Sequence, residues 1–244
     1  MRIAVLSDFH GNLTALEAVA ADLKFTRPEL VLQGGDIAFG GHRAAEVVDF
    51  IRAQNWPGVL GNTDEMLWRP ELRTDLERRI PKLASLWRAL FEEQGPATIG
   101  LLGDERLAWL RTLPDEWRSR DAQIGLVHAS PGNLWTAPGT DAAEEQLRAV
   151  YGPLHCSVVV YGHIHRPYVR SLPGLNVANS GSVGLPYDGD PRASYLLIDE
   201  GKLTIRRIEY DVDRECRELL ASSYPLATWI AQVRRKGSYV PPES

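Results

Sequence analysis

The feature that most constrains this chain is a recurring unit in which a short apolar run leads directly into polar side chains. Five such units end in Asp8-Phe9-His10, Gly35-Asp36, Gly61-Asn62-Thr63-Asp64, His128 and Gly162-His163-Ile164-His165. We expect the runs to be buried strands, because short continuous apolar runs are typical of strands covered on both faces. Neighbouring parallel strands end at one edge of a sheet, so these polar side chains can converge although they lie far apart in the sequence.

The order of the predicted elements favours an α/β fold. Strands are expected over residues 3–6, 30–33, 58–60, 124–127, 157–161, 176–178, 193–199 and 203–209, the last two forming a hairpin. Helices over residues 13–24 and 44–54 alternate with the first three strands, and the first helix can be capped by Asn12. Short connections between alternating strands and helices imply parallel pairing.

Residues 65–120 have a different character and are predicted to form a helical insertion. They are rich in Leu, Trp, Arg and Glu at helical spacing, with one strand signal at 97–99 and a further helix at 104–113. The tail at about 211–244 is expected to be helical as well. Without a repeat or a low-complexity linker, we expect residues 1–244 to form a single domain.

The charge balance excludes some classes of partner. The formal net charge of −5 argues against a dominant nucleic-acid or anionic-membrane surface, so nucleic acid is expected only as a possible substrate. The N-terminal apolar stretch is too short for a signal-peptide core, and nothing approaches the roughly 20 apolar residues of a membrane span. We therefore expect a cytoplasmic protein without a membrane partner, and the oligomeric state stays open.

The polar units together have the chemistry of a metal site. Carboxylates, imidazoles and an amide oxygen suit divalent ions such as Mn²⁺, Fe²⁺, Co²⁺, Ni²⁺ or Zn²⁺. Each unit alone is weak evidence, since an Asp-x-His pair arises often by chance and a Gly-Asp after a strand usually forms a turn. Their occurrence together, each at a predicted strand end, makes a chance origin remote. Glycines before Asp36, Asn62 and His163 fit sharp turns that allow close backbone approach.

This ordered set resembles the motif pattern of the calcineurin-like metallophosphoesterase superfamily. The family pattern is D-x-H, then GD, GN-x-[DE], H and GH-x-H, and the five units above match it in order over residues 1 to about 200. The segments 7–12 and 179–184 narrow the resemblance to the compact bacterial and archaeal branch of small phosphodiesterases. The resemblance implies a four-layer α/β (α+β) fold with two packed mixed β-sheets flanked by helices.

The resemblance also implies which residues bind metal. One ion would be bound by Asp8, His10, Asp36 and His165, and a second by Asp36, Asn62, His128 and His163. The Asp36 carboxylate would bridge two divalent ions, with Mn²⁺ favoured and Fe, Ni, Co or Zn as alternatives. A bridging water or hydroxide would attack phosphorus directly, and Asp36, Asn62, His128 and Asp64 would form the catalytic set.

Thr63 departs from the family pattern, which often has a histidine at this position to protonate the leaving oxygen. A threonine hydroxyl can donate a hydrogen bond but cannot act as an acid near pH 7, which favours phosphodiesters or activated monoesters. His42 is a candidate substitute acid or an ordinary loop histidine. Asp64 could orient a ligand or cap the following helix.

Substrate contacts are expected from Asn12, Arg192 and Thr63. Asn12 could instead cap its helix, and Arg192 could instead pair with a nearby carboxylate. The expected substrate is a small-molecule phosphoester, in a cleft shaped by the helical insertion. A phosphoprotein phosphatase, a dinucleoside polyphosphatase and a metal-binding scaffold with little turnover are the alternatives.

Overall fold

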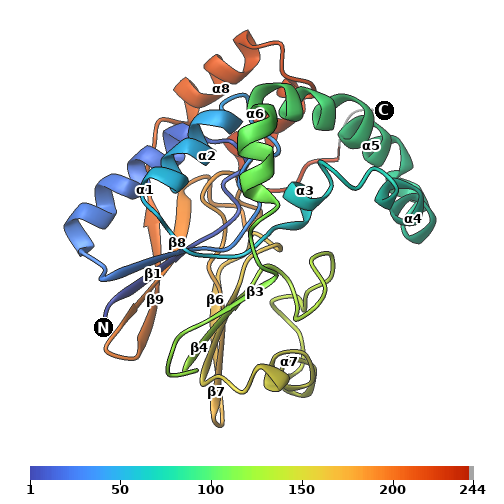
Figure 1. Ribbon diagram of the computed structural model, residues 1–244. Coiled ribbons are helices and arrows are strands. Elements are labelled where there is room, and N and C mark those ends of the chain that lie inside the picture. Colours follow the sequence, from blue (N-terminus) through green and yellow to red (C-terminus); the bar gives the residue numbers. More distant parts are fainter. Residues whose placement is uncertain (242–244) are drawn as a thin grey trace.

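The computed structural model describes residues 1–241, and its strands form two mixed sheets that pack face to face (Figure 1). The first sheet has the order β2 (Leu30–Gln33), β1 (Ile3–Leu6), β8 (Ala193–Asp199) and β9 (Lys202–Ile208). The second has the order β3 (Glu116–Arg118), β4 (Ile124–Val127), β5 (Val158–Tyr161), β7 (Leu175–Asn179) and β6 (Tyr168–Leu172). β1 is parallel to β2, and β4, β5 and β7 are mutually parallel; the other pairs are antiparallel.

Successive side chains of each strand point to opposite faces of its sheet, so an apolar strand packs against the other sheet on one face and against helices on the other. In β1, Ile3 and Val5 point between the sheets and pack in one cluster with Leu126 and Val160 of the second sheet. Leu6 belongs to a different cluster, under the helices on the outer face. Strands buried on both faces produce the continuous apolar runs of the sequence, and the predicted arrangement of two packed mixed sheets flanked by helices is confirmed.

Helices cover the outer face of each sheet (Figure 1). The described helices are α1 (Leu13–Thr26), α2 (Ala44–Ala53), α3 (Asn62–Glu65), α4 (Leu72–Arg79), α5 (Ala84–Ala89), α6 (Gly95–Leu110), α7 (Glu144–Tyr151), α8 (Val212–Ala221) and α9 (Ala227–Lys236), with short 3₁₀ turns at Pro81–Leu83 and Gly152–Leu154 and a π-helical turn at Leu90–Gln94. α1 and α2 pack on the first sheet and α6 packs on α2, whereas α7 covers the second sheet.

The segment predicted as a helical insertion is helical from α3 to α6, but the strand expected at 97–99 is wrong. These residues lie inside α6, where Thr98 Oγ1 donates to Gln94 O at 2.8 Å. Pro96 at the first turn of that helix is a helix-start signal that outweighs the short β-branched run. Gly103 breaks the helical backbone with φ 64°, so the helix expected from residue 104 is the second half of α6.

Other predicted boundaries also differ from the structure. The strand expected at 58–60 is reduced to one bridge between Gly58 and Gln33. Pro57 has no N–H to donate, and Leu60 N bonds instead to Pro114 O at 2.8 Å, so the ladder does not continue. β3, β6 and α7 were not predicted.

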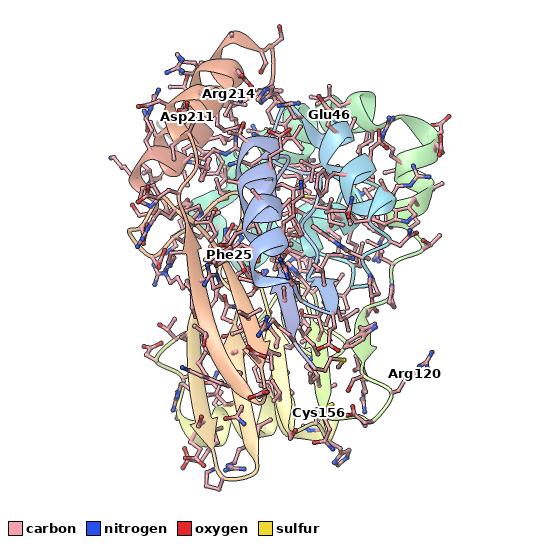
Figure 2. All side chains as sticks on the ribbon, turned by 90° about the vertical axis from the view of Figure 1, so that its left-hand side faces the viewer. Phe25, Glu46, Arg120, Cys156, Asp211 and Arg214 are labelled. Atoms are coloured by element: carbon pink, nitrogen blue, oxygen red, sulfur yellow. The ribbon has the colours of Figure 1, made fainter. Side chains whose placement is uncertain are left out.

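The C-terminal tail forms two helices that return to the body of the molecule. α8 begins at Val212 and is capped by Asp211, whose side chain accepts from Arg214 N at 2.8 Å (Figure 2). α8 and α9 pack together around Cys216, Ile230 and Val233, and they share this cluster with Leu185 from the loop before β8. Residues 242–244 of the predicted tail lie outside the described residues.

Within residues 1–241, none of the helices combines the length and the apolar character that crossing a membrane requires.

Candidate metal centre

The polar motifs meet where strand ends of the two sheets adjoin. Asp8 N donates to Gly35 O at 3.0 Å, which joins the loops after β1 and β2. Gly162 N donates to His128 O at 2.9 Å, which joins the ends of β4 and β5. His163 N donates to both oxygens of the Asp8 carboxylate at 3.1–3.2 Å, so the loops of the first sheet are bonded to those of the second.

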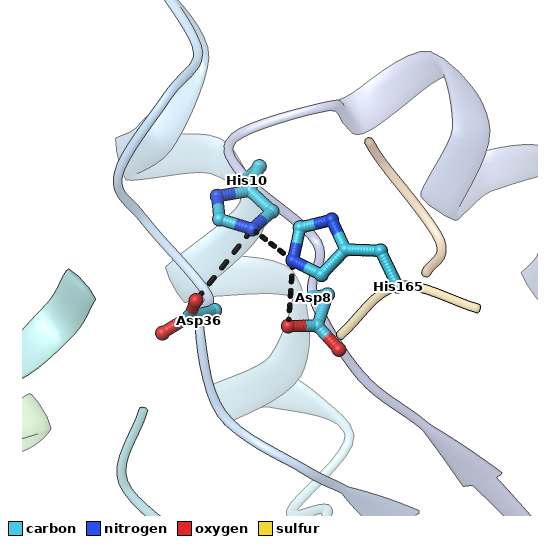
Figure 3. A group of neighbouring side chains, drawn as sticks. All are labelled: Asp8, His10, Asp36 and His165. Atoms are coloured by element: carbon cyan, nitrogen blue, oxygen red, sulfur yellow. Dashed lines mark hydrogen bonds and ion pairs between the residues drawn. The ribbon is translucent and has the colours of Figure 1, made fainter. Parts of the chain in front are cut away.

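Four of the predicted ligands form one buried cluster: Asp8, His10, Asp36 and His165 (Figure 3). Their donor atoms all lie within 4.8 Å of one another. His165 Nε2 is 3.1 Å from Asp8 Oδ1, and His10 Nε2 is 3.6 Å from Asp36 Oδ2. This group can hold a metal ion.

The histidine tautomers in this cluster fit a cation. His10 Nδ1 lies 2.7 Å from Phe39 O, and His165 Nδ1 lies 2.5 Å from Leu185 O. A carbonyl oxygen only accepts, so each Nδ1 carries a proton, and in the neutral form of either ring the lone pair lies on Nε2. The two Nε2 atoms face each other at 3.2 Å, an arrangement of electron pairs that a positive ion between them would stabilise.

A second donor set lies on the other side of Asp36. Asn62 Oδ1 is 2.8 Å from His128 Nε2 and 2.9 Å from His163 Nδ1. His128 Nδ1 lies 2.8 Å from Gly34 O, which fixes the ring in the same way as His10 and His165. Asp36 Oδ1 is 3.5 Å from His128 Nε2, so the two oxygens of one carboxylate face the two donor sets.

Burial governs the charge states of these groups. Burial, together with the neighbouring His165, lowers the pKa of His10 to about 4. Burial and His128 likewise lower the pKa of His163 to about 4. Burial opposes ionisation of Asp8, but His165 and the other histidines hold the pKa of its carboxyl below the usual range. Burial opposes the charged form of His165, but the adjacent Asp8 carboxylate raises the pKa of its ring. At neutral pH the centre therefore combines the Asp8 carboxylate with neutral imidazoles at His10 and His163, which are the forms that bind metal.

Asp64 is fully buried and supports the loop that follows Asp36. Its carboxylate accepts from Ile37 N and Ala38 N at 3.0–3.1 Å. Burial and the nearby Asp36 carboxylate raise the pKa of Asp64 to about 7. Asp64 lies in the first turn of α3, whose N-cap residue is Gly61. The Asp64 side chain therefore holds the backbone that follows Asp36, and the residue at the N-cap of α3 is Gly61 and not Asp64.

The backbone at the cluster is unusual. Asp8, His10, Asp36, His163 and His165 all have positive φ, between 48° and 64°. Left-handed backbone in non-glycine residues costs on the order of 1–3 kcal/mol each and is concentrated at functional sites.

Two of the glycines approach carboxylates closely. A Cβ on Gly61 would lie 2.2 Å from Asp36 Oδ1, and a Cβ on Gly162 would lie 2.5 Å from Asp8 Oδ2. The predicted close approach is therefore made to the carboxylates themselves.

The residues predicted to contact substrate differ in their surroundings. Asn12 is fully buried, accepts from Ala15 N as the cap of α1, and donates to Gly184 O and Tyr210 Oη. Arg192 is directed to Asp190, with Nη2 2.6 Å from Oδ2. Asn12 thus caps its helix and Arg192 pairs with a nearby carboxylate, while a contact of either side chain with substrate stays a prediction.

Thr63 and His42 are placed in different environments. Thr63 N donates to Asp36 Oδ1 at 2.9 Å, and the buried Thr63 Oγ1 has no hydrogen-bond partner among the described residues. His42 is half-buried, with Nδ1 3.9 Å from Glu215 Oε1 of α8, and burial lowers the pKa of its ring. Thr63 is therefore held beside Asp36, whereas His42 faces the C-terminal helices.

One contact at the centre was missed by sequence reasoning. The Tyr187 ring stacks on the His165 ring with centroids 4.4 Å apart and planes 17° from parallel. Tyr187 N also donates to His165 O at 3.2 Å. The sequence contains one indication of this contact. Tyr187 lies two residues after Leu185, whose carbonyl fixes His165, and both follow the 179–184 segment that carries the family resemblance.

Comparisons with known proteins agree with this geometry. Residues 1–202 match the model of the calcineurin-like phosphoesterase superfamily domain. An uncharacterised protein of Methanocaldococcus jannaschii is 30% identical over 251 residues, covering 94% of this chain and 96% of that protein. The crystal structure of a metallophosphoesterase from Sphaerobacter thermophilus has a TM-score of 0.76 at 25% identity, covering 97% of this chain and 99% of that one. A hypothetical protein of Pyrococcus horikoshii has a TM-score of 0.79 at 20% identity, covering 98% and 99%.

Proposed function

The chain belongs to the calcineurin-like phosphoesterase superfamily, and on this premise we propose that it is a two-metal phosphodiesterase acting on a small-molecule phosphoester. The observation that carries the proposal is the position of Asp36. Its Oδ2 is 3.6 Å from His10 Nε2, while its Oδ1 is 3.5 Å from His128 Nε2. One carboxylate thus faces two donor sets, as a ligand shared by two ions would.

The donor sets have the composition that divalent transition ions prefer. The first ion would be held by Asp8, His10, Asp36 and His165, and the second by Asp36, Asn62, His128 and His163. Imidazole and carboxylate ligands without thiolates favour ions such as Mn²⁺ or Fe²⁺ over the softer ions that prefer sulfur ligands. We propose Mn²⁺ as the working ion, with Fe, Ni, Co and Zn as alternatives.

When bound, such paired ions lower the pKa of water toward neutrality and neutralise charge on the phosphoryl oxygens. The chain's own contribution is rigidity. His10, His128 and His165 are each fixed by a backbone carbonyl, and Asp64 holds the Asp36 loop through two amides. Preorganised polar groups stabilise charge in a transition state without reorganising during the reaction.

The leaving group decides which esters suit this site. Hydrolysis adds water across a P–O bond, so the departing oxygen must gain a proton or be stable without one. Thr63 Oγ1 is buried beside Asp36 and has no partner in the described chain, so its hydroxyl is available to donate a hydrogen bond. Because a hydroxyl is not an acid near pH 7, phosphodiesters with good leaving groups are favoured.

The helical insertion and the loop after His128 together line a cavity. A space of about 240 Å³ is lined by residues of α3 and α4 and by the loop after His128, among them Glu65, Leu72 and Trp135. Trp135 Nε1 donates to Glu65 Oε2 at 2.8 Å, so two of the lining residues are bonded to each other. We propose that this cavity receives the alcohol part of the substrate, as expected for a cleft shaped by the insertion.

Metal content and an ester panel test the function. Chelated protein is reloaded with Mn²⁺, its bound metal is measured by elemental analysis, and nitrophenyl phosphodiester, nitrophenyl monoester, dinucleoside polyphosphate and phosphopeptide substrates are compared. We expect two ions per chain and the highest kcat/KM on the phosphodiester. His155→Ala is a matched control, because this exposed histidine lies outside the cluster.

Other results would contradict parts of the proposal. Preference for the dinucleoside polyphosphate or the phosphopeptide would replace the substrate class. Two bound ions without turnover of any ester would favour a metal-binding scaffold. Fewer than two ions in active protein would refute the shared-carboxylate site.

We also propose a cytoplasmic location. Cys156 and Cys216 are both free and buried, and they lie in different clusters of the fold. Unpaired thiols are typical of compartments that keep cysteines reduced.

A further inference from the structure

Arg234 of α9 places a fully buried guanidinium group directly behind the loops of the metal centre. Its Nη2 donates to His10 O at 2.9 Å and to Gly40 O at 3.3 Å, and its Nε donates to Gly184 O at 3.2 Å. Its Nη1 donates to Glu215 Oε1 at 2.6 Å. Both charged side chains have no exposed surface. One planar group thus joins three loops and α8.

The three carbonyls belong to the segments that orient two histidine ligands. His10 is itself a predicted ligand, and Gly40 directly follows Phe39, whose carbonyl fixes His10 Nδ1. Gly184 directly precedes Leu185, whose carbonyl fixes His165 Nδ1. A shift of the guanidinium would therefore move both rings of the cluster formed with Asp8 and Asp36.

Stability alone is a poor explanation for this ion pair. Desolvating two charges costs several kcal/mol per ion, and well-packed apolar residues often replace a buried pair without loss of stability. The second oxygen of Glu215 is also held in place, since its Oε2 accepts from Thr14 Oγ1 at 2.6 Å. A second contact from the same region reaches the same loop, because Gly40 N donates to Tyr224 Oη at 3.1 Å. The C-terminal segment is thus built against the loop that follows Asp36.

The family resemblance does not account for Arg234. The superfamily match ends at residue 202, so Arg234 and Glu215 lie beyond it. In the sequence, residue 234 follows Ile230 by four positions and Ala231 by three, so it lies on the apolar stripe of α9 where a charge is unexpected. A charged residue on a buried stripe was the signal available before the structure.

We propose that Arg234 is a positioning residue for the metal site of Asp8, His10, Asp36 and His165, and that helices α8 and α9 are therefore part of the metal centre. This inference rests on the proposed two-metal function. All four acceptors of Arg234 belong to Glu215 or to the loops around His10 and His165. Loss of Arg234 should therefore weaken metal binding at one of the two metal sites and leave the other unchanged.

The test is a Mn²⁺ titration of chelated protein, monitored by isothermal titration calorimetry. We expect the wild type to show two binding phases. In Arg234→Lys the charge that pairs with Glu215 is kept, but the planar fork that spans three carbonyls is lost. We expect one phase to weaken by about 10–100-fold, the range for losing a group that orients metal ligands, while the other is unchanged. It should be the phase that His165→Ala also weakens.

A double variant separates positioning from stability. Arg234→Gln alone leaves the Glu215 carboxylate buried and unpaired, which lowers the Tm. Arg234→Gln with Glu215→Gln removes both charges, so we expect its Tm to recover while the affected phase stays weak. Arg206→Gln is the matched control, since Arg206 forms a two-bond pair with Asp22 between β9 and α1. It should lower the Tm and leave both phases intact.

Three results would overturn the role of Arg234: equal weakening of both phases, recovery of metal affinity along with the Tm in the double variant, or weakening by Arg206→Gln. Failure of the two-metal function has a different signature. Wild-type protein would then show a single phase, whatever the behaviour of the variants.

Discussion

Gly162 offers a sharp test of how tightly the loops of the two sheets are fitted together. A Cβ at this position would lie 2.1 Å from Ser7 Oγ, 2.5 Å from Asp8 Oδ2 and 2.9 Å from Ser7 Cβ. Real Cβ atoms essentially never approach closer than 3.0 Å, so Gly162→Ala requires a shift of about 1 Å. Ser7 cannot yield freely, since it is buried and its hydroxyl donates to Gly34 O.

The size of the effect follows from that shift. Overpacking a tight interior costs about 1–3 kcal/mol, so we expect the Tm to fall. Displacement of the Asp8 carboxylate also moves a predicted ligand, and a misplacement of about 1 Å can lower a rate by about 100-fold. We therefore expect kcat/KM on a nitrophenyl phosphodiester to fall by about 100-fold and one Mn²⁺ phase to weaken. Differential scanning calorimetry, Mn²⁺ titration and steady-state kinetics measure the three effects.

Gly100→Ala is the control, because a Cβ on this glycine of α6 meets nothing within 4 Å. It should leave activity unchanged and stabilise the protein by up to about 1 kcal/mol through helix propensity. The reasoning would be refuted if Gly162→Ala kept both wild-type metal affinity and wild-type activity. Loss of stability with unchanged metal binding would show that Ser7, and not Asp8, absorbs the strain.

Three further predictions test the assignment of ligands and the leaving-group chemistry. Asp36→Ala should remove both ions and lower activity by at least about 100-fold, and two metals per chain in elemental analysis would contradict the bridging role. His165→Ala and His128→Ala should each weaken a different Mn²⁺ phase, so loss of the same phase in both would refute the partition. Wild-type rates should depend steeply on leaving-group pKa, and Thr63→His should raise rates on alkyl esters by up to about 10²–10⁴-fold. A flat dependence would mean that another acid already serves, with His42→Ala as the next variant.

The strand ends were predictable because one pattern encodes both burial and chemistry. β1 and β5 are continuous apolar runs that lead into Asp8 and His163, and both are strands of the structure at nearly the predicted bounds. β6 was not predictable in this way, since Tyr168–Leu172 is only partly buried and has a mixed sequence. It forms because it pairs with β7, and this tertiary contact cannot be read from the strand propensity of its own residues.

The contacts around the centre divide in the same manner. The convergence of His10 with His165 could be expected from motif order, whereas the partners of Arg234 could not, because its four acceptors include three backbone carbonyls that have no residue-specific signature. The left-handed backbone at Asp36 could likewise not be predicted, since glycine is the residue that usually indicates this conformation in a sequence.

The path of the chain determines when the centre can assemble during folding. The guanidinium of Arg234 bonds to a carbonyl 224 positions earlier, and the two facing imidazoles are 155 positions apart. Contacts of such long range form late, because loop closure must precede them, and they slow folding. A chain emerging from the ribosome presents His10 long before α9, so the contact between His10 O and Arg234 can form only after α9 has been synthesised. On the proposed function, we therefore expect tight metal binding to follow the docking of α9 rather than to precede it.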